Sequence, residues 1–502
     1  MIMKKRQFIA ALLTSVFFLT AISCEKQDTV EEKTQPETTT AQEETTAFVP
    51  ALHIPSDIDY GGRTFTVEAV ALNDPIHNPF ALEEMNGEIL NDTVYSAVCN
   101  VEELLNIDLV QAYSKDVFDY GRLRTAAISG DDSIDVFSYI DRFGTNQAAG
   151  GYVVPYESIP TIDLSMPWWY SEVNDAISIA GHYCFAIGAM NMDVVANMQT
   201  IVFNKRILET FNLENPYQLV DDGKWTIDTM YRMISDVATD LNGDSLMTAD
   251  DLYGAVYTHD VWFNNFGPLS GEFIVEKDKD DIPYMNVLGN DHLLSLWQKM
   301  LGYATSDDVF CVSKLGDSKK YNLDGSIYNE VLYMFADGKA LFSSSSSLVS
   351  ISYLRDMKDD FGIIPFPKEN EVGAGSTYGS YINGIGQPYF VPASNSDLEL
   401  TGYVFEALCY ENYYNVVDTY LESVAMNKQV RDEESARMLK MMYSNKVVDI
   451  SSGYWWEDTN AQMYDVFRSG ENTFVSTYEK HAAAAEKAIE KTVEIFRGFG
   501  EN

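Results

Sequence analysis

Arg63-Thr-Phe-Thr-Val-Glu-Ala-Val-Ala71 is the first segment of the sequence with a clear structural period. Its side chains alternate, with Phe65, Val67 and Ala69 on one face and polar residues between them. A period of two residues is typical of a strand that buries one face. We therefore expect this segment to form the first strand of a sheet.

The segments that follow alternate between helical and strand-like patterns. Apolar residues recur at helical spacing from Val94 to Leu105, after Asn91 and Asp92, which can cap the helix. Further patterns predict a strand over 107–112, a helix over 120–129 and a strand over 135–139. This order predicts an α/β fold with a mainly parallel sheet, in which ligands bind beyond the carboxyl ends of the strands.

A second α/β unit is expected from about residue 197 onward. Residues 197–205 have a strand-like pattern, and Trp225 and Thr226 precede a predicted amphipathic helix. More strands are predicted over 340–351, 361–366 and 389–391, and an Ala/Glu/Lys-rich helix over 479–496. A chain with 46% hydrophobic residues and this length exceeds one small domain of roughly 100 to 200 residues, so two lobes are expected.

The N-terminal residues indicate export. Three basic residues at positions 4–6 precede an uncharged run over 8–20, which is typical of a signal peptide and shorter than the ~20 residues of a membrane-spanning helix. The run ends in Ala21-Ile-Ser-Cys24, which resembles the lipobox of bacterial lipoproteins. Residues 1–23 would then be removed and Cys24 would carry lipid; ordinary secretion with an incidental cysteine is the alternative. Residues 24–55, rich in Glu and Thr, predict a disordered tether.

Composition excludes several classes of function. The chain carries a formal net charge of −42, and so acidic a surface repels nucleic-acid phosphates and anionic lipid headgroups. Beyond Cys24, the sequence has Cys99, Cys184, Cys311 and Cys409, none in a CxxC pair, and six scattered histidines. This pattern favours buried thiols and does not support a zinc site.

Several segments resemble, in order, the extracellular solute-binding proteins of ATP-binding-cassette importers, the group that includes maltose-binding protein. The segments that carry the resemblance are Ile201-Val-Phe-Asn-Lys-Arg206, Asn215-Pro-Tyr217, Lys224-Trp-Thr226, Asp337-Gly-Lys-Ala340, Phe361-Gly-Ile-Ile-Pro-Phe-Pro-Lys368 and Tyr389-Phe-Val-Pro-Ala-Ser394. The match spans about residues 60 to 500, and its strength lies in the order and spacing of the segments.

The resemblance implies a two-lobe, type II periplasmic-binding-protein-like α/β fold with a ligand cleft between lobes joined by hinge strands. By that template lobe one is 56–195 plus 385–430, and lobe two is 196–384 plus 431–502. The longer N-terminal half and the acidic loop over 240–251 depart from the family pattern. The implied partners are a small polar ligand and the permease subunits of an importer, with membrane contact only through the lipid anchor; we expect a monomer on the extracellular face.

The acidic loop has the spacing of a calcium-binding loop. Oxygen side chains occupy loop positions 1, 3, 5, 9 and 12, with a backbone carbonyl available at position 7, and the residues are Asp240, Asn242, Asp244, Leu246, Thr248 and Asp251. Ser245 replaces the usual glycine and Asp251 the usual glutamate. The loop resembles those of dockerins, so we predict a structural Ca²⁺; a solvated turn is the alternative.

Aromatic clusters suggest a carbohydrate ligand, since sugar sites pair aromatic platforms with amides and hydroxyls. The candidate ligand-binding residues are Trp168, Trp169, Trp262, Asn264, Ser344, Ser345, Trp455 and Trp456. The family resemblance places Trp455 or Trp456 where a late helix presents an aromatic ring to the cleft. In adjacent pairs we expect one ring to face the ligand and the other the core.

No catalytic motif is recognised: the sequence lacks GxSxG, a P-loop and GxGxxG. We therefore expect a binding protein and not an enzyme, which captures a sugar or oligosaccharide for a permease. Two alternatives stay open. A glycosidase needs only two carboxylates at the right separation, and a polysaccharide-binding adhesin needs no transporter.

Overall fold

The computed structural model of the chain describes residues 50–69, 76, 79–113, 121–312, 327–345, 347–382, 386–425 and 432–500. The predicted signal peptide, Cys24 and the tether up to residue 49 lie outside the described residues, as do residues 70 and 71 of the first predicted strand. Contacts between residues divide the chain at residue 49, and residues 50–502 form one compact unit.

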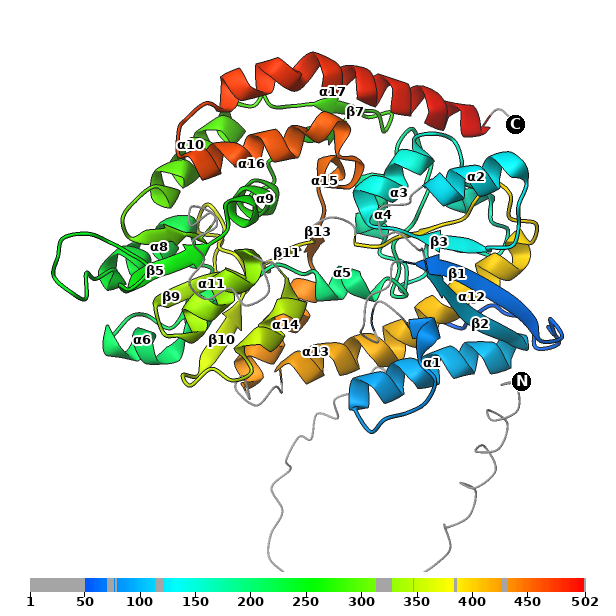
Figure 1. Cartoon of the computed structure of the whole chain (residues 1–502), viewed down its shortest axis with the longest axis horizontal. Coiled ribbons are helices and arrows are strands. Elements are labelled where there is room, and N and C mark those ends of the chain that lie inside the picture. The colour runs from blue at the N-terminus through cyan, green and yellow to red at the C-terminus, as the bar shows by residue number, and fades with distance from the viewer. Residues whose placement is uncertain are drawn as a thin grey trace, which may run out of the picture. The chain divides into compact units, whose positions relative to one another are not determined.

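The first sheet confirms the predicted strand–helix order (Figure 1). Its strands lie in the order β12 (Tyr389–Phe390), β3 (Val136–Ser138), β1 (Arg63–Ala69), β2 (Ile107–Tyr113). Strand β1 pairs in parallel with both β2 and β3, and helices α1 (Ile89–Leu105) and α2 (Gly121–Ser129) make the crossovers. Strand β12 returns from far along the sequence and pairs with β3 in the antiparallel direction.

Helix α1 shows how this half of the core is built. Val94, Val98 and Val101 are buried against the sheet, as their helical spacing predicts. The helix begins at Ile89, so Asn91 and Asp92 lie inside its first turn and do not cap it, which corrects the sequence expectation. The Asp92 carboxylate instead accepts hydrogen bonds from the backbone N–H groups of residues 86 and 87, just before the helix.

The second sheet has five strands in the order β10 (Phe361–Ile364), β4 (Thr200–Asn204), β9 (Ala340–Ser345), β5 (Tyr253–Tyr257), β8 (Val309–Cys311). Strand β5 pairs in parallel with β8 and β9, whereas β4 runs antiparallel to β9 and β10. All residues of β4 and β5 are buried. The predicted strand over 340–351 is too long, since a 3-10 helix over Leu348–Leu354 follows β9.

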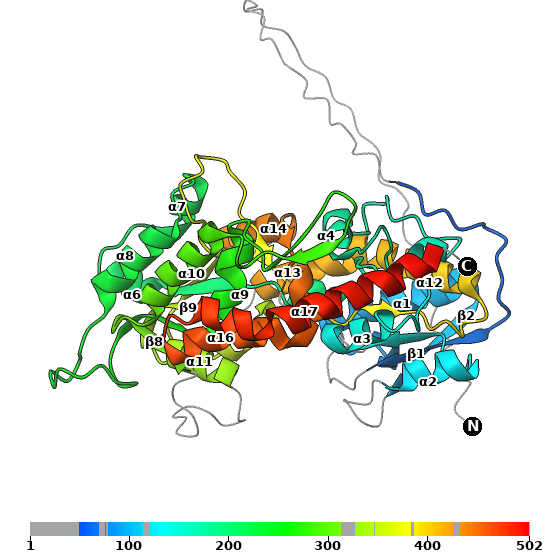
Figure 2. The same cartoon turned by 90° about the horizontal axis from the view of Figure 1, so that it is seen from above.

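Two short strand pairs lie outside these sheets, and the first of them connects distant parts of the chain. Strand β11 (Ser380–Tyr381) pairs in parallel with β13 (Lys446–Val447), and β6 (Val275–Lys277) forms a hairpin with β7 (Pro283–Met285). Helix α17 (Phe474–Arg497) spans the regions around both sheets (Figure 2). At its N-terminal end the Phe474 ring packs on Trp297, and just beyond its C-terminal end Phe499 packs on His182.

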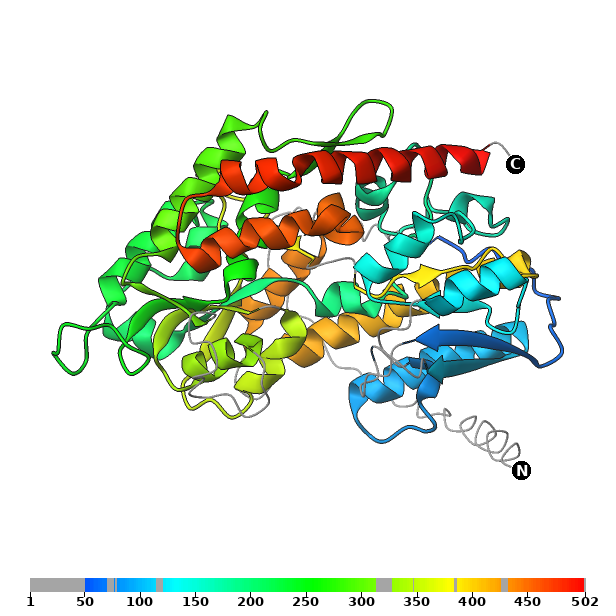
Figure 3. The same ribbon diagram turned by 45° about the horizontal axis from the view of Figure 1, so that its top comes forward.

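The remaining helices cover the sheets and the segment between them (Figure 3). They are α3 (Asp141–Ala148), α4 (Ser171–Ile177), α5 (Met192–Ala196), α6 (Lys205–Thr210), α7 (Pro216–Asp221), α8 (Ile227–Val237), α9 (His259–Leu269), α10 (Asp291–Ala304), α11 (Ile327–Ala336), α12 (Leu398–Glu411), α13 (Val417–Ala425), α14 (Glu433–Tyr443), α15 (Ile450–Tyr454) and α16 (Thr459–Ser469). None of the described helices combines the length and the apolar character that crossing a bilayer requires. Within the described part of the chain no disulfide joins Cys99, Cys184, Cys311 and Cys409, and all but Cys99 are buried.

Candidate functional site

One wall of the candidate site begins at the carboxyl end of β3 in the first sheet. The chain leaves β3 at Ser138 and enters α3 at Asp141. On this helix Arg142 and Asn146 are exposed and lie one turn apart, so both side chains are presented on the same face. Loops at the carboxyl ends of parallel strands are where α/β sheets bind ligands, because no helix or strand fills that edge.

The opposite wall comes from the connection between α15 and α16. Trp455 follows the last residue of α15 and has left-handed backbone geometry, with φ of 51°. Glu457 and Asp458 are also left-handed, with φ of 50° and 54°. Such conformations cost free energy for residues with a Cβ atom, and they concentrate at ligand-binding sites, where the fold holds a side chain in a set direction.

A cavity of about 560 Å³ lies between these walls. Its lining residues are Arg142, Asn146, Trp455, Glu457, Asp458, Ala461, Gln462 and Tyr464. The Arg142 guanidinium lies 5.4 Å from the centroid of the Trp455 ring, and the Tyr464 ring lies 6.4 Å from it. The cavity thus combines an aromatic platform with amide, carboxylate and guanidinium groups, a mixture suited to a polar ligand that also has an apolar face.

His259, which lies after a strand of the second sheet, contacts the wall of this cavity. This residue begins α9 directly after β5, and its ring centroid is 5.3 Å from that of Tyr464. Burial lowers the pKa of His259, and the neighbouring carboxyl of Asp260 opposes that shift. The aromatic contacts therefore run from the carboxyl end of β5 through Tyr464 and Trp455 to Arg142, which follows β3. The cavity itself is lined by α3 and by the segment from Trp455 to Tyr464, and Tyr464 connects its wall to the residues after β5.

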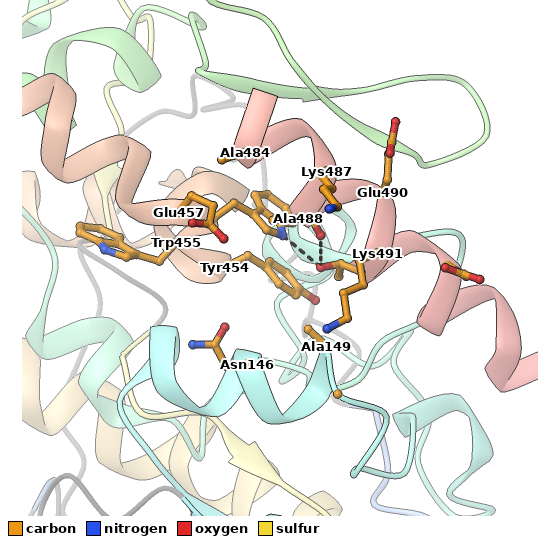
Figure 4. Close-up of a pocket in the computed structure, with 14 residues that line it drawn as sticks. Asn146, Ala149, Tyr454, Trp455, Glu457, Ala484, Lys487, Ala488, Glu490 and Lys491 are labelled. Atoms are coloured by element: carbon orange, nitrogen blue, oxygen red, sulfur yellow. Dashed lines mark hydrogen bonds between the residues drawn. The ribbon is translucent and has the colours of Figure 1, made fainter. Parts of the chain in front are cut away.

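A second cavity, of about 720 Å³, adjoins the first and shares Asn146, Trp455 and Glu457 with it. It lies between α3, the end of α15 and α17 (Figure 4). Tyr454 and Trp456 line it with their rings stacked, at a centroid separation of 4.9 Å and an interplanar angle of 7°. The Trp456 indole N–H donates to the Thr492 hydroxyl at 3.1 Å.

Trp455 and Trp456 show the alternating arrangement expected of adjacent tryptophans. Trp455 is half-buried and points away from α17 (Figure 4), while Trp456 is 7% exposed and packs on Tyr454. Trp455 is therefore the ring that can offer a face to a ligand.

Trp168 and Trp169 are placed in the core of the first lobe's fold. Both are at most 2% exposed, and both indole N–H groups donate to the Glu406 carboxylate, at 2.7 and 2.8 Å. Burial raises the pKa of Glu406, and the two indole donors oppose that shift. The indole N–H groups are hydrogen-bonded and the ring faces are buried, so both residues belong to the core. Trp169 also borders a small hollow of about 240 Å³ beside Lys446.

The candidates of the second sheet are also buried. Trp262 is 2% exposed and stacks on Tyr257 at 4.3 Å, and Asn264 is 9% exposed beside a cavity of only about 10 Å³. Ser344 is 5% exposed, and its hydroxyl has no hydrogen-bond partner within the described chain. The side chain of Ser345 lies outside the described residues. Trp262, Asn264 and Ser344 do not line the cavity beside Trp455.

The hydroxyl of Ser344 belongs to a wider pattern at the same sheet edge. The side-chain oxygens of Thr200, Thr258 and Ser343 are likewise buried and have no partner among the described residues. Thr200 begins β4, Thr258 directly follows β5, and Ser343 lies near the end of β9. Buried polar atoms are normally hydrogen-bonded, so this edge has unused capacity for water or for a ligand group.

The side chains of the acidic loop form hydrogen bonds within the loop. Asp240 accepts from the backbone N–H groups of Gly243 and Ser245 at 2.7 Å each, and Asp244 accepts from that of Leu246 at 2.8 Å. Asp251 accepts from the backbone N–H and hydroxyl of Thr248, and backbone hydrogen bonds lower its pKa. Ser245 has φ of 66°, the left-handed conformation of the glycine it replaces.

These hydrogen bonds hold the loop without any ion. Asn242 shares in them, donating from its amide to Asp244 at 3.0 Å. Among the described residues, no group of three or more His, Cys, Asp or Glu side chains is arranged to hold a metal. Calcium at Asp240, Asn242, Asp244, Leu246, Thr248 and Asp251 therefore stays a prediction.

Sequence reasoning missed most of the cavity wall. Arg142 and Asn146 follow the strand β3, and their position after a predicted parallel strand was a usable signal. Tyr464 and Gln462 gave no such signal, because they lie on an amphipathic helix whose exposed side chains look like an ordinary solvated face.

No family model and no curated protein matches the amino-acid sequence. Solved structures match the fold. A sugar transporter of Rhizobium etli in an open conformation has a TM-score of 0.54 at 13% identity, covering 86% of this chain and 99% of that one. A cyclo/maltodextrin-binding protein complexed with maltotetraose has a TM-score of 0.50 at 13% identity, covering 87% and 97%.

A third similar structure is an ABC substrate-binding protein of Listeria monocytogenes in complex with cycloalternan. Its TM-score is 0.50 at 11% identity, with 88% of this chain and 99% of that one covered. Nearly the whole of each of these proteins is matched, so the similarity concerns a complete architecture and not one shared motif. The chain has the two-lobe α/β fold of these solute-binding proteins, as its sequence predicts.

Proposed function

We propose that this chain is the extracellular solute-binding protein of an ATP-binding-cassette importer, and that it captures a sugar or oligosaccharide and releases it unchanged to a permease. The observation that carries the proposal is the cavity between α3, which follows β3, and the connection between α15 and α16, with Trp455 as its aromatic platform. A ligand held there contacts α3 in the first proposed lobe and the segment from Trp455 to Tyr464 in the second, so binding and the relative position of the lobes are coupled.

The chemistry of the cavity favours a carbohydrate. A pyranose ring has an apolar face of C–H groups that stacks on an indole, and a rim of hydroxyls that needs donors and acceptors. Asn146, Gln462 and Asp458 supply such groups around the Trp455 ring. Two of the similar structures were solved with maltotetraose and with cycloalternan, which supports the same ligand class here.

The lobes proposed from the sequence are 56–195 plus 385–430 and 196–384 plus 431–502. Each contains one of the two sheets, apart from strand ends. The chain crosses between these lobes after residues 195, 384 and 430. An isolated bridge pairs Met198 with Ile382 beside the first two crossings, next to the β11–β13 ladder, and we place the hinge there.

Export and anchoring belong to the same proposal. Cys24 would carry the lipid, and residues 24–55 would tether the binding unit outside the cell near its permease. Replacing Cys24 with Ala should abolish the incorporation of labelled palmitate, because the acceptor thiol is removed. Continued labelling of that variant would contradict the anchor.

Calorimetric titration of the purified binding unit with sugars and oligosaccharides tests the proposal. We expect one class of saccharide to bind with a Kd near micromolar, about −8 kcal/mol, which is tight enough for capture and weak enough for release. Chromatography of the recovered ligand should show it intact. Cleaved product would indicate a glycosidase, and binding restricted to insoluble polysaccharide would indicate an adhesin.

A further inference from the structure

The cavity beneath α17 is a second chamber that the proposed capture of one sugar ring at Trp455 does not use. Its walls are formed by small residues on both sides, Ala149 and Gly150 after α3, and Ala484 and Ala488 on α17. Larger side chains at these positions would close it. At about 720 Å³ it exceeds the 560 Å³ cavity beside it, and each volume alone is enough to accommodate a small ligand.

The charged groups of this chamber are Lys487, Glu490, Lys491 and Glu494 of α17 together with Glu457 after α15. Lys487 and Lys491 lie one turn apart on the lining face, and Lys491 extends toward Ala149 on the opposite wall, whereas Glu490 points the other way (Figure 4). Neither lysine forms an ion pair or hydrogen bond with another described residue. In a chain with 76 acidic residues, two neighbouring lysines thus keep their donors available toward a cavity.

The inner surface of the chamber is aromatic and rigid. Tyr454 and Trp456 stack on each other, and Trp456 is held to α17 by its hydrogen bond to Thr492. The two chambers meet at Asn146, Trp455 and Glu457. A ligand that extends from one chamber into the other therefore lies against these three residues.

We infer that the chamber beneath α17 is a distal subsite, and that the ligand is an oligosaccharide whose chain extends past Trp455 into it. The subsite takes the sugar rings that follow the one stacked on Trp455, with Lys487 and Lys491 donating to ring hydroxyls. This inference rests on the proposed function and specifies its ligand class: a monosaccharide fills one chamber and leaves the other to water.

The experiment measures affinity against chain length for the full chain. Linear gluco-, manno- and xylo-oligosaccharides, from the monosaccharide to the pentasaccharide, are titrated by calorimetry. In the series that binds, affinity should rise about tenfold or more as rings are added beyond the first. Equal affinity of the monosaccharide and its longer homologues would overturn the inference while leaving the proposed function intact.

A variant that fills the chamber beneath α17 tests whether the affinity added by further sugar rings arises there. Ala488→Trp places a large ring in the chamber, and the matched control Ala483→Trp puts the same ring on an exposed position of α17 outside the lining. Ala488→Trp should remove the affinity gained from the added rings and leave monosaccharide binding unchanged, and Ala483→Trp should change neither. Full retention of the chain-length gain in Ala488→Trp would overturn the distal subsite.

A second pair of variants serves if the blocking ring disturbs folding. Lys487→Ala combined with Lys491→Ala should weaken binding of the longest oligosaccharide by at least about fivefold, with the exposed Lys480→Ala as control. Unchanged affinity in the double variant would remove the lysines from the subsite. If no saccharide of any length binds the wild-type chain, the proposed function itself fails, and the inference fails with it.

Discussion

The orientation of Trp455 is set both by its backbone conformation and by the contacts of its ring. A left-handed residue with a bulky side chain is uncommon, and here it turns the indole away from the stacked pair formed by Tyr454 and Trp456. The Arg142 guanidinium lies over the ring at 5.4 Å, which orients it further. The geometry leaves a preformed platform, so ligand binding need not order it.

Replacing Trp455 with Ala tests that platform. The change should weaken saccharide binding by roughly 1 to 3 kcal/mol, because the stacking face and its apolar contacts are lost. Calorimetry of the variant and of the control Trp455→Phe, which keeps an aromatic face, gives the comparison. The melting temperatures should stay close, since the ring is half-buried and not part of the core. Wild-type affinity in Trp455→Ala would contradict its role.

Asp449 gives a pH-dependent prediction at the N-terminus of α15. Its carboxylate accepts from the Ser451 backbone N–H at 2.8 Å, and burial raises its pKa from 3.8 to about 6. Between those values the folded state retains a proton that the unfolded state has released. The free energy of unfolding therefore falls as pH rises through this window and is level above it.

The Asp449→Asn variant has no carboxyl to titrate here, so it lacks this fall in the free energy of unfolding with rising pH. The asparagine side chain can still cap the helix. The free energy of unfolding of the variant, measured relative to that of wild type, should therefore rise by on the order of 2 to 3 kcal/mol between about pH 4 and about pH 7. Urea unfolding at both pH values measures the difference. An equal difference between variant and wild type at the two pH values would show that Asp449 does not titrate in this window.

The elements of the fold differ in how far the sequence determined them. The strands β1 and β2 and the helix α1 were predictable because their apolar residues repeat at a regular spacing, and β3 because it is a short buried apolar run. The strand predicted over 340–351 was too long, since Leu348–Leu354 is apolar enough to continue a strand but turns into a 3-10 helix. Local pattern does not specify where a buried apolar segment changes direction.

The site was less predictable than the elements around it. Of the eight ligand-binding candidates, Trp455 lines both chambers and Trp456 lines the one beneath α17. Trp168, Trp169 and Trp262 are also tryptophans but lie in the core. Only their tertiary contacts distinguish them from the two tryptophans of the site. Arg142 and Tyr464 are about 320 positions apart in the sequence and meet only because two separate connections approach each other.

The acidic loop between α8 and β5 is a testable element. We predict that calcium raises the melting temperature of the wild-type chain and that Asp240→Ala abolishes this response, because it deletes the ligand at loop position 1. Asp278→Ala is the control, since Asp278 makes similar turn hydrogen bonds in the β6–β7 hairpin. Calorimetry that shows no calcium uptake at millimolar ion would mean that the loop is only a turn.

At the scale of the whole binding unit, two elements make contacts between the proposed lobes. The β6–β7 hairpin docks on the turn around Ala180, where the Asp281 carbonyl accepts from the Ala180 N–H at 2.9 Å and Lys277 Nζ lies 3.1 Å from the Ser178 carbonyl oxygen. Helix α17 packs on both sides. Closure must therefore rotate the lobes about these contacts and not separate them, which limits the motion to a hinge.

Small-angle scattering of the full binding unit, with and without the saccharide that calorimetry identifies, tests the central claim most directly. Capture between two lobes predicts a smaller radius of gyration at saturating ligand, a parallel change in tryptophan fluorescence, and intact ligand recovered afterwards. A saturated protein whose radius is unchanged, or whose ligand is recovered as cleaved product, would contradict the account of a solute-binding protein that closes on its ligand and releases it unaltered.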